Sequence, residues 1–125
     1  MAKPPVLFSD TQNLISTIEK RLNAPLITYY NSNAGNVCGN DASAMYEILK
    51  GKKIDTAYLF IKSDGGSGIA ALRIISTLRN DCKNVIALIP SNCASAATMM
   101  ALGANEIVMC PLAYLTPVDT SLKHE

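Results

Sequence analysis

The sequence predicts an α/β protein with a largely parallel sheet and flanking helices, and three observations lead to this fold class. Amphipathic helical patterns alternate with short apolar runs along the chain. The apolar runs are continuous, which is typical of strands that are buried on both faces. The chain has 125 residues, of which 49% are hydrophobic and 17% charged, so we expect one globular domain over residues 1–125.

A helix and a strand are expected first. Apolar residues recur at helical spacing from Leu14 to Leu22, and Ser9 or Asp10 is available as the N-cap. Residues 26–30 follow, and their β-branched and aromatic side chains predict a strand.

A second helix is expected to begin at Asp41, after a polar loop, and to end at Gly51. Its apolar residues at helical spacing are expected to point inward, and these are Ala44, Met45, Ile48 and Leu49. Residues 57–61 are short and apolar, and they predict a second strand. The order of elements therefore remains one of alternation.

The second half of the chain continues in the same way. A third helix is expected from about Ile69 to Leu78, followed by a strand over 85–89 that Pro90 ends. A fourth helix is expected over residues 95–102, with a last strand over 106–109. Strands that alternate with helices in this way predict parallel pairing through helical crossovers.

Charge and composition exclude some classes of partner. The net charge is only +1, so no broad basic field is present to attract nucleic acid or an anionic lipid surface. The longest apolar stretch is interrupted by polar residues and a proline, and we expect no membrane-spanning helix. High apolar content with little charge favours an apolar surface that is buried by another subunit or by missing chain.

The cysteine pattern indicates neither zinc nor a disulfide framework. Cys38, Cys82, Cys93 and Cys110 form no C-x-x-C motif, and His124 is the only histidine. The opening residues have no apolar segment typical of a signal peptide. We therefore expect reduced, mostly buried thiols, a cytoplasmic chain, and neither a metal nor a cofactor.

Two loops follow neighbouring strands and can carry chemistry. The first is Ser63-Asp64-Gly65-Gly66-Ser67-Gly68, in which paired glycines allow backbone amides to point into a site. It lacks the lysine of a phosphate-binding P-loop and the third glycine of a dinucleotide fingerprint. A simple tight turn between strand and helix remains an alternative.

The second loop, residues 90–97, brings Ser95 to the start of a helix among small residues. Ser95 is a candidate nucleophile, although a serine in this position can also be only an N-cap. Ser91 and Cys93 are competing nucleophile candidates in the same loop. Because the two loops follow neighbouring strands, one can supply an oxyanion hole and the other a nucleophile at one edge of the sheet.

These two loops resemble those of the ClpP/crotonase superfamily. Residues 59–67 resemble the strand and glycine turn of the Clp protease proteolytic subunit and of signal peptide peptidase A, and residues 93–104 resemble their nucleophile helix. The pattern of residues 101–109, followed by Leu115-Thr116-Pro117-Val118-Asp119, is similar to the serine dehydrogenase proteinase-like branch. The resemblance covers most of residues 10–122.

The resemblance implies a ClpP/crotonase-like spiral of β-β-α units and hydrolysis of peptide bonds through an acyl-enzyme. By position, Ser95 would be the nucleophile, the backbone amides of Gly66 and Ala96 would form the oxyanion hole, and Gly65 would shape the turn. The substrate would be a peptide or an unfolded protein. The resemblance also favours a homo-oligomer in which the helices after the two loops bury apolar faces.

The chain departs from the family pattern at three places, one of which is Ala97, where relatives often have glycine. Asp64 stands where relatives commonly have proline, and we expect it to face solvent or to cap the following helix. No histidine lies about 25 residues after Ser95, so the general base is not identified; Lys123 and His124 are candidates by residue type alone. Asp119 fits the family pattern and is expected to be structural.

Other functions remain open. A non-catalytic assembly or peptide-binding module with the same fold would need no base, and a crotonase-type acyl-CoA enzyme would use the amide pair without Ser95. Superfamily members generally continue beyond the segment that ends at Asp119. We therefore expect the domain to lack the usual C-terminal part.

Overall fold

The computed structural model describes residues 8–118, and Asp119, Lys123 and His124 lie outside them. Helices and strands alternate in the expected order, and two very short strands are added to them. The elements are α1 (Phe8–Leu22), β1 (Leu26–Tyr30), α2 (Gly39–Leu49), β2 (Ile54–Lys62), α3 (Gly68–Asp81), β3 (Cys82–Ile89), β4 (Asn92–Cys93), α4 (Ala96–Leu102), β5 (Glu106–Met109) and β6 (Tyr114–Leu115).

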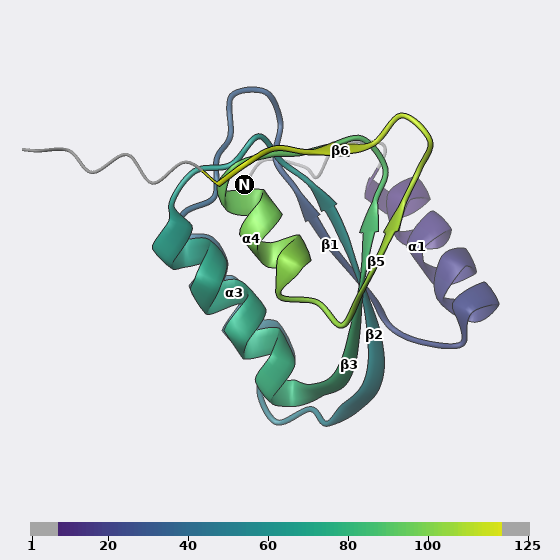
Figure 1. The fold of residues 1–125 in the computed structure, drawn as a ribbon. Helices are drawn as coiled ribbons and strands as arrows, with labels where there is room; N and C mark the ends of the chain where they lie inside the picture. The colour runs from purple at the N-terminus through teal and green to yellow at the C-terminus, as the bar shows by residue number, and fades with distance from the viewer. Residues whose placement is uncertain (1–7, 119–125) are drawn as a thin grey trace, which may run out of the picture.

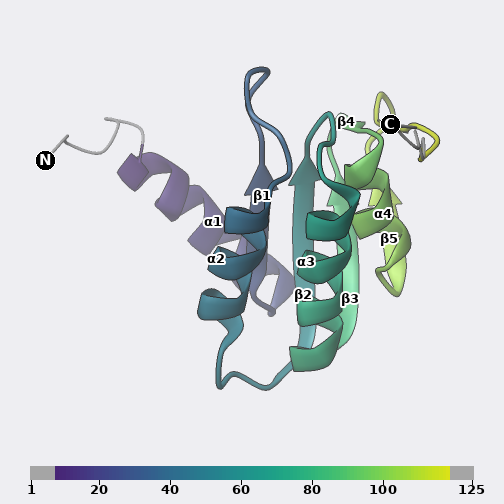
Figure 2. The ribbon, with the colours of Figure 1, turned by 90° about the vertical axis from the view of Figure 1, so that its left-hand side faces the viewer.

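The main sheet has four strands in the order β1-β2-β3-β5, and every neighbouring pair is parallel. The crossovers carry α2, α3 and α4, which stand side by side on one face of this sheet (Figure 2). Helix α1 lies on the other side of the sheet from α3 and α4 (Figure 1). The predicted α/β class, with a mostly parallel sheet and flanking helices, is confirmed.

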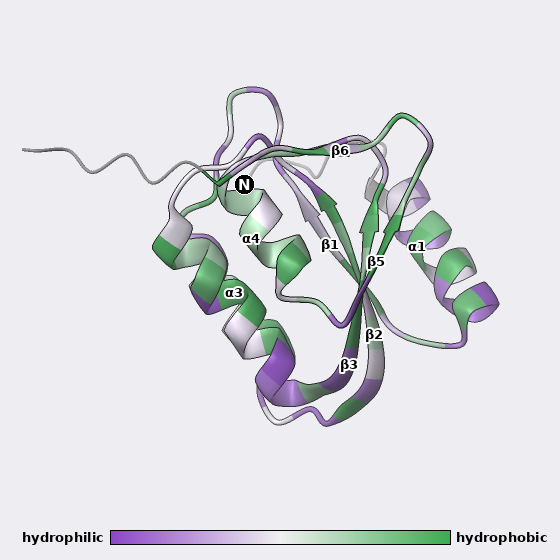
Figure 3. Cartoon of the chain, in the orientation of Figure 1, coloured by the Kyte–Doolittle hydropathy of each residue, from purple (hydrophilic) through white to green (hydrophobic). Residues whose placement is uncertain are grey.

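The core lies between the sheet and the layer of α2, α3 and α4. On β2, Ala57, Leu59 and Ile61 are fully buried and alternate with half-buried residues that face the other way. Apolar residues line β5 and much of α3 and α4 (Figure 3). The expectation from its continuous apolar run that β2 is buried on both faces is therefore only partly correct. The side chains on one face are fully buried, and those on the other face are half-buried.

Two helices expose more apolar surface than their spacing predicts. In α2 the buried residues are Ala42, Met45 and Leu49, while Ile48 is 51% exposed. Helix α2 packs against both the sheet and α3, and the expectation that Ala44 and Ile48 point inward is wrong. In α1, Leu14 is 64% exposed because only β1 lies against this helix to any extent.

The short strands lie beyond the carboxyl ends of the main sheet. Strand β4 pairs with β6 in parallel, with Asn92 opposite Tyr114 and Cys93 opposite Leu115. Single parallel bridges also join Ser63 to Cys93 and Val37 to Gly66. The segments that follow β1, β2, β3 and β5 are thus tied to one another at one end of the fold, where Figure 1 shows β6 crossing above α4.

Candidate active site

The two loops that the sequence singles out meet beyond the carboxyl ends of β2 and β3. The backbone N–H of Ser63 donates to Asn92 O at 3.1 Å, and that of Ala94 donates to Ser63 O at 2.9 Å. Ser63 is fully buried at this junction. Parallel neighbouring strands end at the same edge of a sheet, which is why residues about thirty positions apart come together here.

Ser95 has a strained backbone and an uncommitted hydroxyl. It immediately precedes α4 with φ 55° and ψ −120°, and its side chain caps no backbone N–H of that helix. Within residues 8–118 its hydroxyl has no hydrogen-bond partner, and the residue is half-buried. A non-glycine residue in such a conformation costs about 1–3 kcal/mol, and strain of this kind concentrates at functional sites.

The paired glycines fit a space that no side chain can occupy. Gly65 has φ +109°, and a Cβ there would lie 2.9 Å from both Ala94 O and Ser95 Cβ. Gly66 has φ +148°, and a Cβ there would lie 2.5 Å from the backbone N and O of Val37. The turn is therefore wedged between Val37 on one side and the Ser95 segment on the other, and both positions require glycine.

Among residues 8–118, the two backbone amides that directly follow the contacting residues Gly65 and Ser95 are unpaired. The N–H groups of Gly65, Ser67, Ser95 and Ala97 donate to Ser63 Oγ, Val37 O, Thr116 Oγ1 and Ala94 O, respectively. Those of Gly66 and Ala96, which alternate with them, have no partner among residues 8–118. Unpaired amides are uncommon in folded proteins, and such a pair can bind the oxygen of a ligand.

A polar network that sequence reasoning missed supports the glycine turn. The Ser63 hydroxyl donates to Asn31 Oδ1 at 2.5 Å and accepts from Gly65 N–H at 3.1 Å. Asn31 follows β1 and Ser63 follows β2, and the backbone N–H of Asn31 donates to Lys62 O at 2.8 Å. Their positions directly after two strands are the sequence signal that could have found them.

Tyr29 and Asp41 form a second pair at this end of the sheet. The Tyr29 hydroxyl donates to Asp41 Oδ2 at 2.5 Å, and that carboxylate also accepts from Cys38 N–H at 3.3 Å. Burial, and then the hydrogen bond to Asp41, raises the pKa of Tyr29 above its ordinary value. The hydrogen bond therefore anchors α2 to β1, and the Tyr29 hydroxyl keeps its proton near pH 7.

Asp64 faces solvent and does not cap α3. It is exposed, and its carboxylate accepts a hydrogen bond from Asn92 Nδ2. The cap of α3 is Ser67, whose hydroxyl accepts from Ala70 N–H at 3.1 Å. The Asn92 side chain thus links the two loops at the protein surface.

The competing nucleophiles are already engaged. The Cys93 thiol is fully buried and donates to Ala97 O at 3.2 Å. Burial raises the pKa of Cys93 to about 12, so the reactive thiolate is scarce at neutral pH. The Ser91 hydroxyl donates to the side chain of Asn92 at 3.2 Å. Ser95 is the candidate in this loop whose nucleophilic atom has no hydrogen-bond partner in the part of the chain that the structure describes.

No general base is in place within residues 8–118. No lysine or arginine in this range is hydrogen-bonded to Ser95, and the Lys62 ammonium lies 4.8 Å from the centre of the Tyr30 ring. The candidates Lys123 and His124 lie outside the described residues. The structure therefore brings the candidate nucleophile Ser95 to the glycine turn, whereas no candidate base lies there among the described residues.

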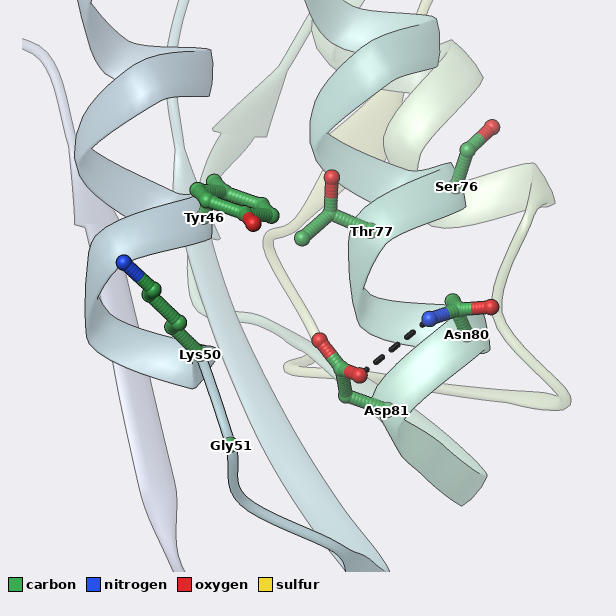
Figure 4. A pocket seen from close by; sticks show the side chains of 7 residues that line it. All are labelled: Tyr46, Lys50, Gly51, Ser76, Thr77, Asn80 and Asp81. Carbon is green, nitrogen blue, oxygen red and sulfur yellow. Dashed lines mark hydrogen bonds between the residues drawn. The ribbon is translucent and has the colours of Figure 1, made fainter.

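A separate polar groove lies between α2 and α3 (Figure 4). It has a volume of about 410 Å³ and is lined by Tyr46, Lys50, Gly51, Ser76, Thr77, Asn80 and Asp81. Helix α3 begins near the glycine turn and contributes its last turns to this groove, about 15 Å away along the helix axis. The groove is therefore not part of the Ser95 site.

Neither known proteins nor metal-binding clusters and membrane-spanning helices among the described residues add to this geometry. Neither a comparison with models of protein families nor a search of curated proteins finds a match to the chain. Between residues 8 and 118, no group of three or more His, Cys, Asp or Glu side chains is arranged to hold a metal ion. No helix in the same range combines the length and the apolar character that crossing a membrane requires.

Proposed function

We propose that the chain is a serine peptidase-like domain of the ClpP/crotonase superfamily, similar to its serine dehydrogenase proteinase-like branch, and that it hydrolyses peptide bonds through an acyl-enzyme at Ser95. One observation carries the proposal: among the described residues Ser95 has a strained conformation and an unpaired hydroxyl, and it packs against Gly65, while the amides that follow these two residues, those of Ala96 and Gly66, are also unpaired there. A structural N-cap would use its hydroxyl on the helix, and Ser95 does not.

In the proposed reaction, Ser95 Oγ attacks the carbonyl carbon of a peptide bond. The Oγ–carbon bond forms, the carbonyl oxygen becomes negative, and the amides of Gly66 and Ala96 donate to it. Each such donor typically contributes about 3 kcal/mol of transition-state stabilisation. The proton of Ser95 passes through the general base to the leaving amine as the carbon–nitrogen bond breaks, and water then hydrolyses the ester.

The arrangement of short strands supports the proposed spiral. Strand β3 is followed by β4 and α4, which makes one β-β-α unit, and β5 followed by β6 repeats its first two elements. The parallel links Val37–Gly66, Ser63–Cys93 and Cys93–Leu115 tie the segments after successive main strands in the same order. A second, smaller layer of parallel segments therefore runs beside the main sheet.

A fluorophosphonate probe tests the catalytic proposal. We expect wild type to be labelled at a single site, Ser95→Ala to lose labelling, and the matched control Ser91→Ala to keep it. If wild type and Ser95→Ala are labelled equally, Ser95 is not the activated nucleophile. Hydrolysis of fluorogenic peptides that follows the same order among the variants extends the test from the probe to the substrate.

A non-catalytic peptide-binding module is the second candidate function. It is favoured by the observation that no basic side chain among residues 8–118 contacts Ser95 through a hydrogen bond. This alternative predicts that peptides bind to wild type while the probe labels neither wild type nor Ser91→Ala. Rapid labelling of wild type excludes it.

We also propose that the protein is a cytoplasmic homo-oligomer. The helices after the two loops leave large apolar side chains exposed, with Ile69 at 76%, Leu72 at 54% and Leu102 at 63%. Exposed apolar residues on neighbouring helices favour association with another copy. Sedimentation that shows only monomer across micromolar concentrations contradicts this part of the proposal.

A further inference from the structure

Thr116 is hydrogen-bonded to Ser95, and the resemblance, whose pattern includes Thr116, implies no role for it. Its Oγ1 accepts from Ser95 N–H at 2.7 Å, across a separation of 21 residues. Thr98, which is buried in α4, has its hydroxyl 2.8 Å from Thr116 O and 3.0 Å from Cys93 O. The hydroxyl and the carbonyl oxygen of Thr116 therefore both accept hydrogen bonds from the segment of residues 95–98.

The hydroxyl of Thr116 pairs with one of the backbone amides at the start of α4, that of Ser95. The first N–H groups of a helix have no intrahelical acceptor, so Ser95 and Ala96 both need an external partner or remain free. Thr116 Oγ1 accepts from the Ser95 N–H, and the Ala96 N–H has no partner among residues 8–118. Without an acceptor on Ser95 N–H, the strained conformation at φ 55° loses its only side-chain contact to that amide among the described residues.

We propose that Thr116 is a positioning residue: its hydroxyl fixes the Ser95 backbone, so that the Ser95 side chain stays against the glycine turn and the Ala96 amide stays available to a ligand. The catalytic consequence rests on the function proposed above, whereas the structural consequence does not. Thr116 itself touches no reacting atom. Its effect passes through Ser95, and a hydroxyl at position 116 is what matters.

Three variants test this inference. Thr116→Val removes the acceptor and keeps the shape, Thr116→Ser keeps the acceptor, and Thr77→Val is a matched control on α3, where Thr77 Oγ1 donates only to Arg73 O. Amide hydrogen exchange resolved at Ser95 measures the backbone, independently of activity. The rate of fluorophosphonate labelling at saturating probe measures the site.

We expect Ser95 exchange to be about ten-fold faster in Thr116→Val, and unchanged in Thr116→Ser and Thr77→Val. The saturating labelling rate should fall about ten-fold in Thr116→Val alone, with probe affinity little changed. Unchanged exchange at Ser95 in Thr116→Val overturns the inference. If wild type is not labelled at all, the proposed function fails, and the exchange result still decides the role of Thr116.

If Thr116→Val does not fold, the exchange rates of two amides in the folded proteins provide a second test. In wild type and Thr116→Ser, the Ser95 amide should exchange more slowly than the unpaired amide of the exposed Gly66. Equal exchange of the two amides in both proteins contradicts the inference.

Discussion

Replacing Gly65 by alanine tests whether the glycine turn and the Ser95 segment are packed together as the structure shows. The new Cβ would lie 2.9 Å from Ala94 O, 2.9 Å from Ser95 Cβ and 3.2 Å from Ala96 N, at a φ of +109°. Each of these contacts is with backbone or with the first atom of a side chain, so no flexible group can move aside. The backbone of residues 94–96 must shift instead.

Two other glycines separate the conformational cost of Gly65→Ala from its steric cost. Gly51 has φ +75° with nothing within 4 Å of its added Cβ, and Gly39 at the start of α2 has neither a positive φ nor a close neighbour. Gly51→Ala should therefore cost about 1–3 kcal/mol for conformation alone. Gly39→Ala should be neutral or stabilise by about 0.4–1 kcal/mol. Gly65→Ala should add about 1–3 kcal/mol of steric strain to the conformational cost.

Urea unfolding and fluorophosphonate labelling provide the measurements. We expect Gly65→Ala to be the least stable of the three variants and to label at least about ten-fold more slowly than wild type, because the strain falls on Ser95. Gly51→Ala should lose stability while it keeps its labelling rate. The reasoning is refuted if Gly65→Ala is no less stable than Gly51→Ala and labels as fast as wild type.

Three further predictions concern the fold around the site. Gly103→Ala should lower the free energy of unfolding by about 1–3 kcal/mol, because its Cβ would lie 2.5 Å from Ile75 Cγ1; calorimetry that shows no change would contradict the packing of α3 on α4. Burial raises the pKa of Cys93 from near 9 to about 12, so its thiol stays protonated in the folded state while the unfolded chain loses the proton. Stability that is full below pH 9 should therefore decline above it, and the stability of wild type relative to Cys93→Ala should fall by about 2 kcal/mol in total from pH 9 to 11 in urea titrations; a constant difference would argue against a buried thiol. Tyr29→Phe removes the hydrogen bond to Asp41 and should cost about 1–2 kcal/mol in thermal unfolding, with an unchanged melting temperature as the contrary result.

Local patterns predict most of the elements but not all of their ends. The strands at 26–30 and 106–109 are found where the sequence places them. Helix α2 begins at Gly39 rather than at Asp41, because Asp41 is the third helical residue and its carboxylate accepts from Cys38 N–H. A cysteine is not a preferred N-cap, so propensity alone points to the aspartate as the first residue of the helix.

The main residues of the candidate site are predicted from the sequence, but the hydrogen bonds that hold them in place are not. The glycine pair and Ser95 are apparent from residue type and position after strands, and the structure brings them into contact. The acceptor on Ser95 N–H is Thr116, and this contact depends on β4 pairing with β6, two-residue strands too short to leave a pattern. Long-range polar contacts of this kind follow from the register of distant segments, which a single sequence does not encode locally.

The structure of the protein after reaction with a fluorophosphonate tests the central proposal most directly. The proposal predicts phosphorus bonded to Ser95 Oγ, with one phosphoryl oxygen about 2.7–3.1 Å from the backbone nitrogens of both Gly66 and Ala96. Phosphorus on another residue, or a phosphoryl oxygen directed away from both amides, would contradict it.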